Sequence, residues 1–206
     1  MKITKLEQSG FIMETNNGFK LAIDVAKMTP LEKLDNINVD AMLVSHIHGD
    51  HFSAEHIKKL SPKKVYLNEE CIVALGDESI STEVVRAGVG DTKNTEGFSV
   101  TFFNVDHGPN VSAPLKENFG FLIEIDGQKI YFAGDMFNPS GIEVSDLEVD
   151  YALLPVGGFY TFGPSEALAF SKQFKKIGKI IPMHFEMKPE QKEEFENLSK
   201  GQFYLL

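Results

Sequence analysis

The chain has 206 residues, of which 42% are hydrophobic and 24% are charged, and its formal net charge at pH 7 is −10. These values are typical of a globular protein with a buried core, so we expect a single domain over residues 1–206. The negative charge disfavours nucleic acid as a partner. The single cysteine, Cys71, excludes an internal disulfide and a cysteine-based zinc site, and its apolar surroundings place it in the core.

The N-terminus lacks the apolar segment of a signal peptide, and no apolar run approaches the ~20 residues that cross a bilayer. We therefore expect a cytoplasmic protein with no membrane span. The sequence does not indicate an oligomeric state.

Two hairpin signals divide the chain into similar halves. Residues 2–15 alternate loosely between polar and apolar, and Asn17-Gly18 then predicts a tight hairpin into a strand that ends at Asp24. The same order returns when Asp126-Gly127 leads into a strand that ends close to Asp135. The repetition predicts two similar halves that each begin with antiparallel strands.

Strands and helices alternate through the rest of the chain. Capping signals predict helices after Thr29-Pro30 and after Ser53, and the alternation predicts a further helix from about Glu69 to Leu75. Short apolar runs predict strands at 41–45, 65–67, 83–87, 98–105, 151–156 and 179–183.

Two helices are expected near the C-terminus. The first begins at Pro164 and ends at Gly178, and the second begins at Pro189. The first has an apolar face at helical spacing, made of Ala167, Phe170, Phe174 and Ile177.

The segment from Ser45 to Phe52 follows an apolar strand and is rich in metal-binding side chains. Within six residues it holds His46, His48, Asp50 and His51. Neutral imidazole and carboxylate suit zinc and neighbouring first-row metals. His46, His48 and Asp50 share one parity, so their side chains can converge. The alternative is a solvated histidine-rich loop without a metal.

Three further residues share this placement, because His107, Asp135 and His184 each follow the end of an apolar strand. Loops at strand ends are where functional groups gather on a rigid scaffold. Each of these residues alone is readily explained as structural. Together with the histidine-rich segment they predict one site, because buried imidazoles and carboxylates without partners are costly.

The pattern His46-x-His48-x-Asp50-His51, followed by His107, Asp135 and His184, resembles the metallo-β-lactamase fold superfamily of metal-dependent hydrolases. The resemblance covers essentially the whole chain in the expected order. It implies an α+β fold, a four-layer αβ/βα sandwich of two mixed sheets with helices on the outer faces. It also assigns His46, His48 and His107 to one metal ion and Asp50, His51 and His184 to a second, with Asp135 bridging both.

The resemblance implies a binuclear reaction centre. Two divalent ions, zinc by expectation with manganese or iron as alternatives, share a water whose pKa falls from 15.7 towards ~7. The resulting hydroxide attacks a small ester, lactone or amide, and the positive site attracts an anionic substrate. Asp50 orients the hydroxide and passes a proton to the leaving group.

Two features of the sequence favour one branch of the superfamily, and two alternative functions stay open. His48 replaces the glutamate of redox di-iron relatives, and residues 155–164 are similar to the L-ascorbate-6-phosphate lactonase-like branch of the superfamily. One alternative is a phosphodiesterase acting on a nucleotide or lipid headgroup. Another, from a different class, is a non-catalytic metal-dependent binding protein.

Several residues are candidates for supporting roles. Asp24 is expected either to hold a ligand imidazole or to cap a turn. His56 is expected at the surface or behind the ligands. Candidate substrate contacts, with solvated loop or core packing as the alternatives, are the polar residues Asn110, Ser112 and Lys116 and the aromatic residues Phe137, Phe159, Tyr160 and Phe162.

Overall fold

The computed structural model describes residues 1–111 and 115–200, which form two compact units. The first unit comprises residues 1–88 and 115–117, and the second comprises the remaining described residues. Each unit is built on one six-stranded mixed sheet. The two units repeat the same order of antiparallel and then parallel pairing, as the repeated hairpin pattern predicts.

The first sheet has the strand order β1-β2-β3-β4-β5-β6. Its first three strands pair antiparallel and the rest pair parallel. The elements of this unit are β1 (Lys2–Lys5), β2 (Phe11–Glu14), β3 (Lys20–Ile23), η1 (Leu31–Leu34), β4 (Ala41–Leu43), α1 (Ala54–Leu60), β5 (Lys64–Leu67), α2 (Glu69–Leu75) and β6 (Glu83–Arg86).

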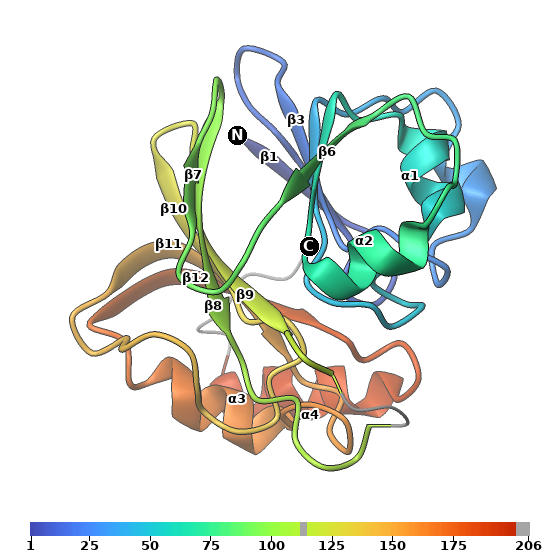
Figure 1. The fold of residues 1–206 in the computed structure, drawn as a ribbon. Coiled ribbons are helices and arrows are strands. Elements are labelled where there is room, and N and C mark those ends of the chain that lie inside the picture. The colour runs from blue at the N-terminus through green and yellow to red at the C-terminus, as the bar shows by residue number, and fades with distance from the viewer. Residues whose placement is uncertain (112–114, 201–206) are drawn as a thin grey trace. The chain divides into compact units, whose positions relative to one another are not determined.

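Helices α1 and α2 lie on one face of this sheet (Figure 1). Both begin at polar caps: Ser53, the predicted cap of α1, accepts the backbone N–H of His56, and Asn68 accepts that of Cys71. Cys71 packs in the core with the apolar residues of α1 and of strands β2 to β5. Burial raises the pKa of the Cys71 thiol, which disfavours the reactive thiolate form in this core position.

The second sheet has the strand order β12-β11-β10-β9-β8-β7. Its antiparallel strands are β7 to β10, and β10, β11 and β12 pair parallel. The elements of this unit are β7 (Thr92–Asn94), β8 (Phe98–Asn104), β9 (Phe119–Ile125), β10 (Gln128–Phe132), β11 (Glu148–Pro155), α3 (Pro164–Ser171), β12 (Lys176–Met183) and α4 (Pro189–Ser199).

The predicted hairpin between β9 and β10 is a two-residue turn. Ile125 pairs with Gln128, and Asp126 and Gly127 between them have φ values of 54° and 72°. Positive φ at both central residues matches the twist of the flanking strands, which explains the Asp-Gly pair.

Side chains alternate between the two faces of the second sheet. Helices α3 and α4 cover the face that carries Phe103 and Tyr131, whose rings stack at 5.3 Å between centroids (Figure 1). The opposite face is a cluster of aromatic side chains made of Phe102, Phe119, Phe121 and Phe132. Gly120 lies opposite Phe103, and a Cβ atom at position 120 would collide with the Phe103 ring.

The predicted helix from Pro164 to Gly178 is wrong in its extent. Helix α3 ends at Ser171, and β12 already begins at Lys176. Gly178 lies inside this strand, where a Cβ atom would sit 2.6 Å from the carbonyl oxygen of Asp150 on β11. The glycine therefore permits close pairing of two strands and does not end a helix. Phe174 reaches the same apolar core from the loop before the strand.

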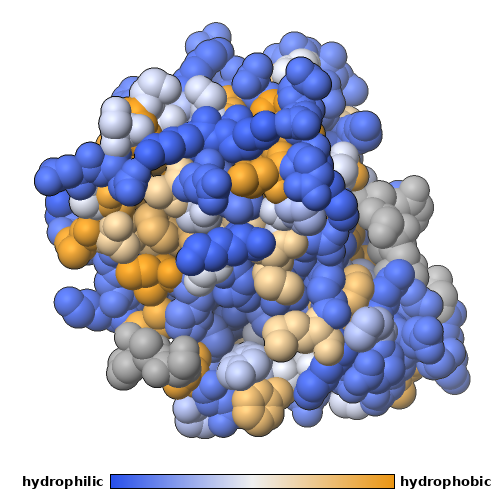
Figure 2. Space-filling view, turned by 90° about the vertical axis from the view of Figure 1, so that its right-hand side faces the viewer, coloured by the Kyte–Doolittle hydropathy of each residue, from blue (hydrophilic) through white to orange (hydrophobic). Residues whose placement is uncertain are grey.

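Hydrophilic residues predominate on the face drawn in Figure 2, and hydrophobic residues appear there only in small groups. Within residues 1–111 and 115–200, no helix has the length and apolarity needed to cross a membrane.

Candidate metal centre

In the first unit, the predicted ligand loop follows β4 and brings His46, His48, Asp50 and His51 together. The backbone N–H groups of His51 and Phe52 both donate to the carbonyl oxygen of His48, at 2.9 and 2.8 Å, so the chain turns tightly after His48. His46 and His51 are fully buried. Nε2 of His46 lies 3.0 Å from Nδ1 of His48, so two imidazole nitrogens face the same point.

Asp24, at the end of β3, orients this loop from behind. One carboxylate oxygen accepts the backbone N–H of Ser45 at 2.7 Å, and the other accepts the Ser45 hydroxyl at 2.6 Å and Nδ1–H of His51 at 2.7 Å. Nε2 of His51 is thereby directed to 3.5 Å from Asp50 Oδ2. A carboxylate behind an imidazole is the usual support of a metal ligand, so the expectation that Asp24 holds a candidate ligand imidazole is confirmed.

Ser45 extends this support to the first histidine. Because its hydroxyl donates to Asp24, its oxygen is left to accept Nδ1–H of His46 at 2.9 Å, so Nε2 is the nitrogen of His46 that could bind a metal ion. Burial raises the pKa of the Asp24 carboxyl, and the contacts with His51 and Ser45 oppose this rise. One buried carboxylate and one hydroxyl thus set the orientation of two imidazoles.

In the second unit, His107, Asp135 and His184 follow β8, β10 and β12, and their side chains meet. Asp135 Oδ2 lies 3.3 Å from Nε2 of His107 and 3.2 Å from Nε2 of His184. All three residues are buried. A single carboxylate oxygen is therefore shared between two imidazoles.

The backbone around Asp135 and His184 is closely constrained. Asn118 donates through its side-chain amide to the carbonyl oxygens of Asp135, at 3.2 Å, and Val105, at 3.4 Å. Gly157 packs on the backbone of His184, where a Cβ atom would collide with the carbonyl oxygen. His184 itself has a φ of 58°, a left-handed conformation that is uncommon for histidine. These contacts fix the direction of both side chains.

The loop that carries His107 is held by Asp106. Its carboxylate accepts the Gly108 N–H and the Asn138 side-chain amide, both at 2.7 Å, and its own N–H donates to the Ser140 hydroxyl at 2.8 Å. The contacts with Asn138 and Gly108 lower the pKa of the Asp106 carboxyl. This aspartate therefore works as an anchor for the turn after β8.

The spacing of the donor atoms within each unit fits a first-row metal ion. Tetrahedral bonds of ~2.0–2.1 Å place two ligand atoms about 3.3 Å apart. The four donor pairs described above are separated by 3.0, 3.5, 3.3 and 3.2 Å. Imidazole and carboxylate donors are those that zinc, manganese and iron accept. The residues present therefore fit the metal chemistry that the sequence predicts.

Gln8 was not predicted as part of the site. It lies in the turn between β1 and β2, its side chain is buried, and its amide donates to Asp50 Oδ2 at 3.2 Å. Its φ of 54° is left-handed. No local sequence signal marks a lone glutamine for such a role, since its partner lies far along the chain.

His56 is buried, which leaves the position behind the candidate ligands as the one of its two expected places that the structure supports. Nδ1 of His56 lies 2.9 Å from the Ser53 hydroxyl, and Nε2–H donates to the carbonyl oxygen of Thr29 at 2.8 Å. With both ring nitrogens engaged, the residue supports the loop behind the ligands.

The polar candidates for substrate contact have structural partners. Asn110 donates to the carbonyl oxygen of Phe159 at 2.6 Å, and the backbone N–H of Lys116 donates to Glu70 at 2.8 Å. Ser112 lies outside the described residues.

The aromatic candidates divide into two groups. Phe162 belongs to the core, and Phe137 packs against Gly108. Phe159 and Tyr160 are 58% and 40% exposed, with ring centroids 4.7 Å apart. A substrate contact by either ring stays a prediction.

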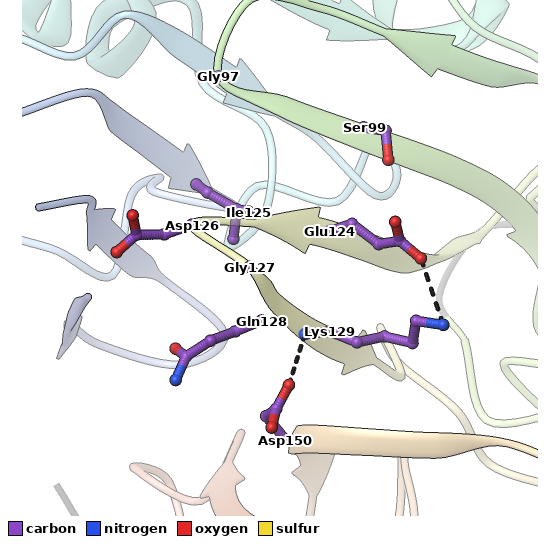
Figure 3. Close-up of a pocket in the computed structure, with 9 residues that line it drawn as sticks. All are labelled: Gly97, Ser99, Glu124, Ile125, Asp126, Gly127, Gln128, Lys129 and Asp150. Carbon is purple, nitrogen blue, oxygen red and sulfur yellow. Dashed lines mark hydrogen bonds and ion pairs between the residues drawn. The ribbon is translucent and has the colours of Figure 1, made fainter. Parts of the chain in front are cut away.

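A separate open pocket of about 430 Å³ lies in the second unit, beside the β9–β10 hairpin (Figure 3). Lys129 in this pocket is engaged twice: its ammonium pairs with Glu124 at 3.2 Å, and its backbone N–H donates to the Asp150 carboxylate at 2.8 Å. Asp135 follows the opposite end of β10, so this pocket is distinct from the candidate ligands.

A family model described as the β-lactamase superfamily domain matches residues 2–184. The chain belongs to the β-lactamase superfamily. A UPF0173 metal-dependent hydrolase of Korarchaeum cryptofilum is 29% identical over 97% of this chain and 90% of the relative. A second one, from Pyrococcus abyssi, is 32% identical over 74% of this chain and 69% of the relative.

Solved structures of two hydrolases share the fold. Igni18, a metallo hydrolase from Ignicoccus hospitalis, is 25% identical with a TM-score of 0.76, over 99% of this chain and 93% of its own. An isothiocyanate hydrolase from Delia radicum gut bacteria has a TM-score of 0.74 at 17% identity, covering 100% of this chain and 95% of its own. The predicted metallo-β-lactamase fold and the assignment as a metal-dependent hydrolase are therefore confirmed. The lactonase-like branch of this superfamily stays a prediction.

Proposed function

We propose that the chain binds two divalent metal ions and hydrolyses a small ester, lactone or amide. The observation that carries the proposal is Asp135 Oδ2, which lies at ligand spacing from both His107 and His184. One oxygen between two imidazoles is suited to bridging two ions. The proposed ligand sets are His46, His48 and His107 for one ion and Asp50, His51 and His184 for the other, with Asp135 serving both.

When bound, the two cations would lower the pKa of water enough to supply a nucleophile at neutral pH and would polarise the substrate oxygen under attack. In the proposal, Asp50 would orient that water, accept the proton that the water loses and pass this proton to the leaving group. Its carboxylate is suited to this task because Gln8 and His51 contact the same oxygen, Oδ2, and so fix its direction. Zinc is the expected ion, with manganese and iron as alternatives.

Metal analysis of the full-length chain tests the proposal. We expect close to two zinc ions per wild-type chain after reconstitution, and fewer in Asp135→Asn because the variant weakens the shared ligand. Hydrolysis by the variant should fall by at least about 100-fold, since even residues behind the ligands are commonly worth 10–100-fold. Asp146→Asn, at an exposed aspartate, is the matched control and should leave both values unchanged.

The substrate panel decides between the reaction classes. It contains esters, lactones, amides and phosphodiesters of matched size. Turnover of phosphodiesters alone would select the phosphodiesterase interpretation. Metal-loaded protein that turns over none of them would favour the binding-protein interpretation, and full activity of metal-free protein would overturn the proposal.

A further inference from the structure

Lys27 lies across the glycine at the centre of the ligand loop. Its backbone N–H donates to the carbonyl oxygen of Gly49 at 3.2 Å. Its side chain folds over the same residue, because a Cβ atom built on Gly49 would lie 3.3 Å from Cδ and 3.5 Å from Nζ of Lys27. Gly49 stands between His48 and Asp50. The ammonium group therefore lies beside the glycine that separates two candidate metal ligands.

The backbone on both sides of Lys27 is fixed. Before it, Asp24 is buried against Ser45 and His51, and Val25 and Ala26 are also buried. After it, the N–H of Thr29 donates to the carbonyl oxygen of Ala26 at 2.8 Å, and the carbonyl oxygen of Thr29 accepts Nε2–H of His56. A segment anchored at both ends presents the lysine with little loss of backbone freedom when a ligand binds.

The ammonium group of Lys27 forms no ion pair with a carboxylate of the described residues 1–111 and 115–200. Most other lysines of the first unit, including Lys33, Lys58 and Lys59, form ion pairs with carboxylates. Lys27 is exposed. In a chain with a net charge of −10, an available cation beside the candidate metal ligands is a feature that an anionic ligand would recognise.

We propose that Lys27 binds an anionic group of the substrate, a carboxylate or a phosphate, and so determines the substrate class of the site. The inference rests on the proposed function, because it assigns a substrate to that same site. A lysine ammonium is a compact charge with three donors, which suits an oxyanion. Because Gly49 has no side chain, the Lys27 side chain can pack directly against the backbone of the ligand loop. Lys27 acts on substrate affinity and takes no part in the bond-breaking step.

Binding of inorganic phosphate to the zinc-loaded, full-length chain tests the inference without reference to turnover. By isothermal titration, Lys27→Met should weaken phosphate binding about tenfold, the usual effect of removing one charge-assisted contact. Lys27→Arg should retain most of the affinity because it keeps the charge. Lys172→Met, at an exposed lysine in the second unit, removes the same charge elsewhere and should leave the affinity unchanged. Equal affinity in the wild type and Lys27→Met, including no measurable binding by either, would overturn the inference.

A kinetic measurement separates this inference from the proposed function. For a pair of esters that differ only in a carboxylate, Lys27→Met should raise KM about tenfold for the anionic ester and leave kcat and the neutral ester unchanged. A selective rise supports the inference. An equal change for both esters would sink it while leaving the hydrolase proposal intact. Absence of turnover in the wild type would count against the hydrolase proposal, and the phosphate titration would still decide the role of Lys27.

Discussion

His51 shows how a single residue outside the proposed ligand set determines the orientation of a candidate ligand. Its Nδ1–H donates to Asp24, so only Nε2 is left to face Asp50. The opposite tautomer would leave the buried Asp24 oxygen without this donor, which is costly in an apolar interior. The orientation of His51 is therefore set by Asp24, which directly follows the neighbouring strand β3. Asp24 also acts on His46, because it accepts the Ser45 hydroxyl whose oxygen contacts His46.

Gln8 is expected to act on Asp50 in the same way. Methionine has a similar length and no N–H, so Gln8→Met should remove the 3.2 Å hydrogen bond to Asp50 while keeping the volume of the buried side chain. We predict a 10–100-fold loss of affinity for the more weakly bound zinc ion, measured by chelator competition, and a lower kcat with little change in KM.

Gln173→Met, at an exposed glutamine, is the control for this substitution. A purely structural role for Gln8 would lower the melting temperature and leave the zinc affinity of the folded protein unchanged. Wild-type zinc affinity in Gln8→Met would therefore contradict the positioning role.

At the scale of single residues, the sequence predicted the candidate site residues whose side chains bind metals, such as histidine and aspartate. Clustered imidazoles and carboxylates at strand ends have few purposes other than metal binding, so the candidate ligands were identified from the sequence. Gln8 and Asn118 carry ordinary amides, and their importance comes only from the groups that they reach. Gln8 and Asp50 are separated by 42 positions, so no local pattern connects them.

At the scale of elements, local interactions made the caps and turns predictable. Ser53 before α1 and Asp126-Gly127 between β9 and β10 act through bonds and dihedral angles of their immediate neighbours. The predicted length of α3 was wrong because it depends on packing between distant parts of the chain and not on local interactions. Phe170 and Phe174 have helical spacing, but both reach the core because the chain passes it twice, once as a helix and once as the loop before β12.

Gly120 offers a test of how β9 packs. Its Cβ position is occupied by the Phe103 ring, which itself stacks on Tyr131. Gly120→Ala should therefore overpack this face of the sheet and lower the free energy of unfolding by about 1–3 kcal/mol, measured by urea denaturation. Replacing Phe103 by leucine in the same chain should recover part of the loss, because the smaller side chain vacates the space.

Gly88→Ala is the control, since no atom lies within 4 Å of a Cβ at that position. It should change the free energy of unfolding by less than about 0.5 kcal/mol. Equal stability of Gly120→Ala and the wild type would show that the Phe103 ring moves freely and that the packing explanation is wrong.

At the scale of the whole molecule, the order of ligands along the chain was the decisive signal. A histidine-rich segment followed by His107, Asp135 and His184 extends over most of the sequence, and this order identified the superfamily. Substrate choice was not predictable in this way, because in our proposal it depends on Lys27, whose position beside Gly49 is known only from the folded structure. The structure divides into two compact units. That residues 1–206 form a single domain stays a prediction.

Metal ions are expected to contribute to the stability of the entire chain. Several candidate ligands are buried, among them His46, His51, His107, Asp135 and His184. An ion that binds the folded state alone stabilises it by about 2.7 kcal/mol at 100 times its Kd, which for a protein of this size corresponds to a rise in Tm of roughly 5–10 °C. Removing metal with a chelator should therefore lower Tm by this amount, measured by differential scanning calorimetry, and zinc should restore it.

Two comparisons distinguish metal binding at the site from a general effect of salt on Tm: a different ion, and a variant that lacks a proposed ligand. Calcium at the same ionic strength should not restore Tm, because it prefers sets of six to eight oxygen donors and the candidate ligands are mainly imidazoles. His46→Ala should show a smaller zinc-dependent rise than the wild type, since it removes a buried ligand of one ion and leaves the proposed second set in place. Equal Tm values with and without zinc in the wild type would mean that the buried imidazoles are satisfied by the protein itself. The metal-dependent proposals would then fail together.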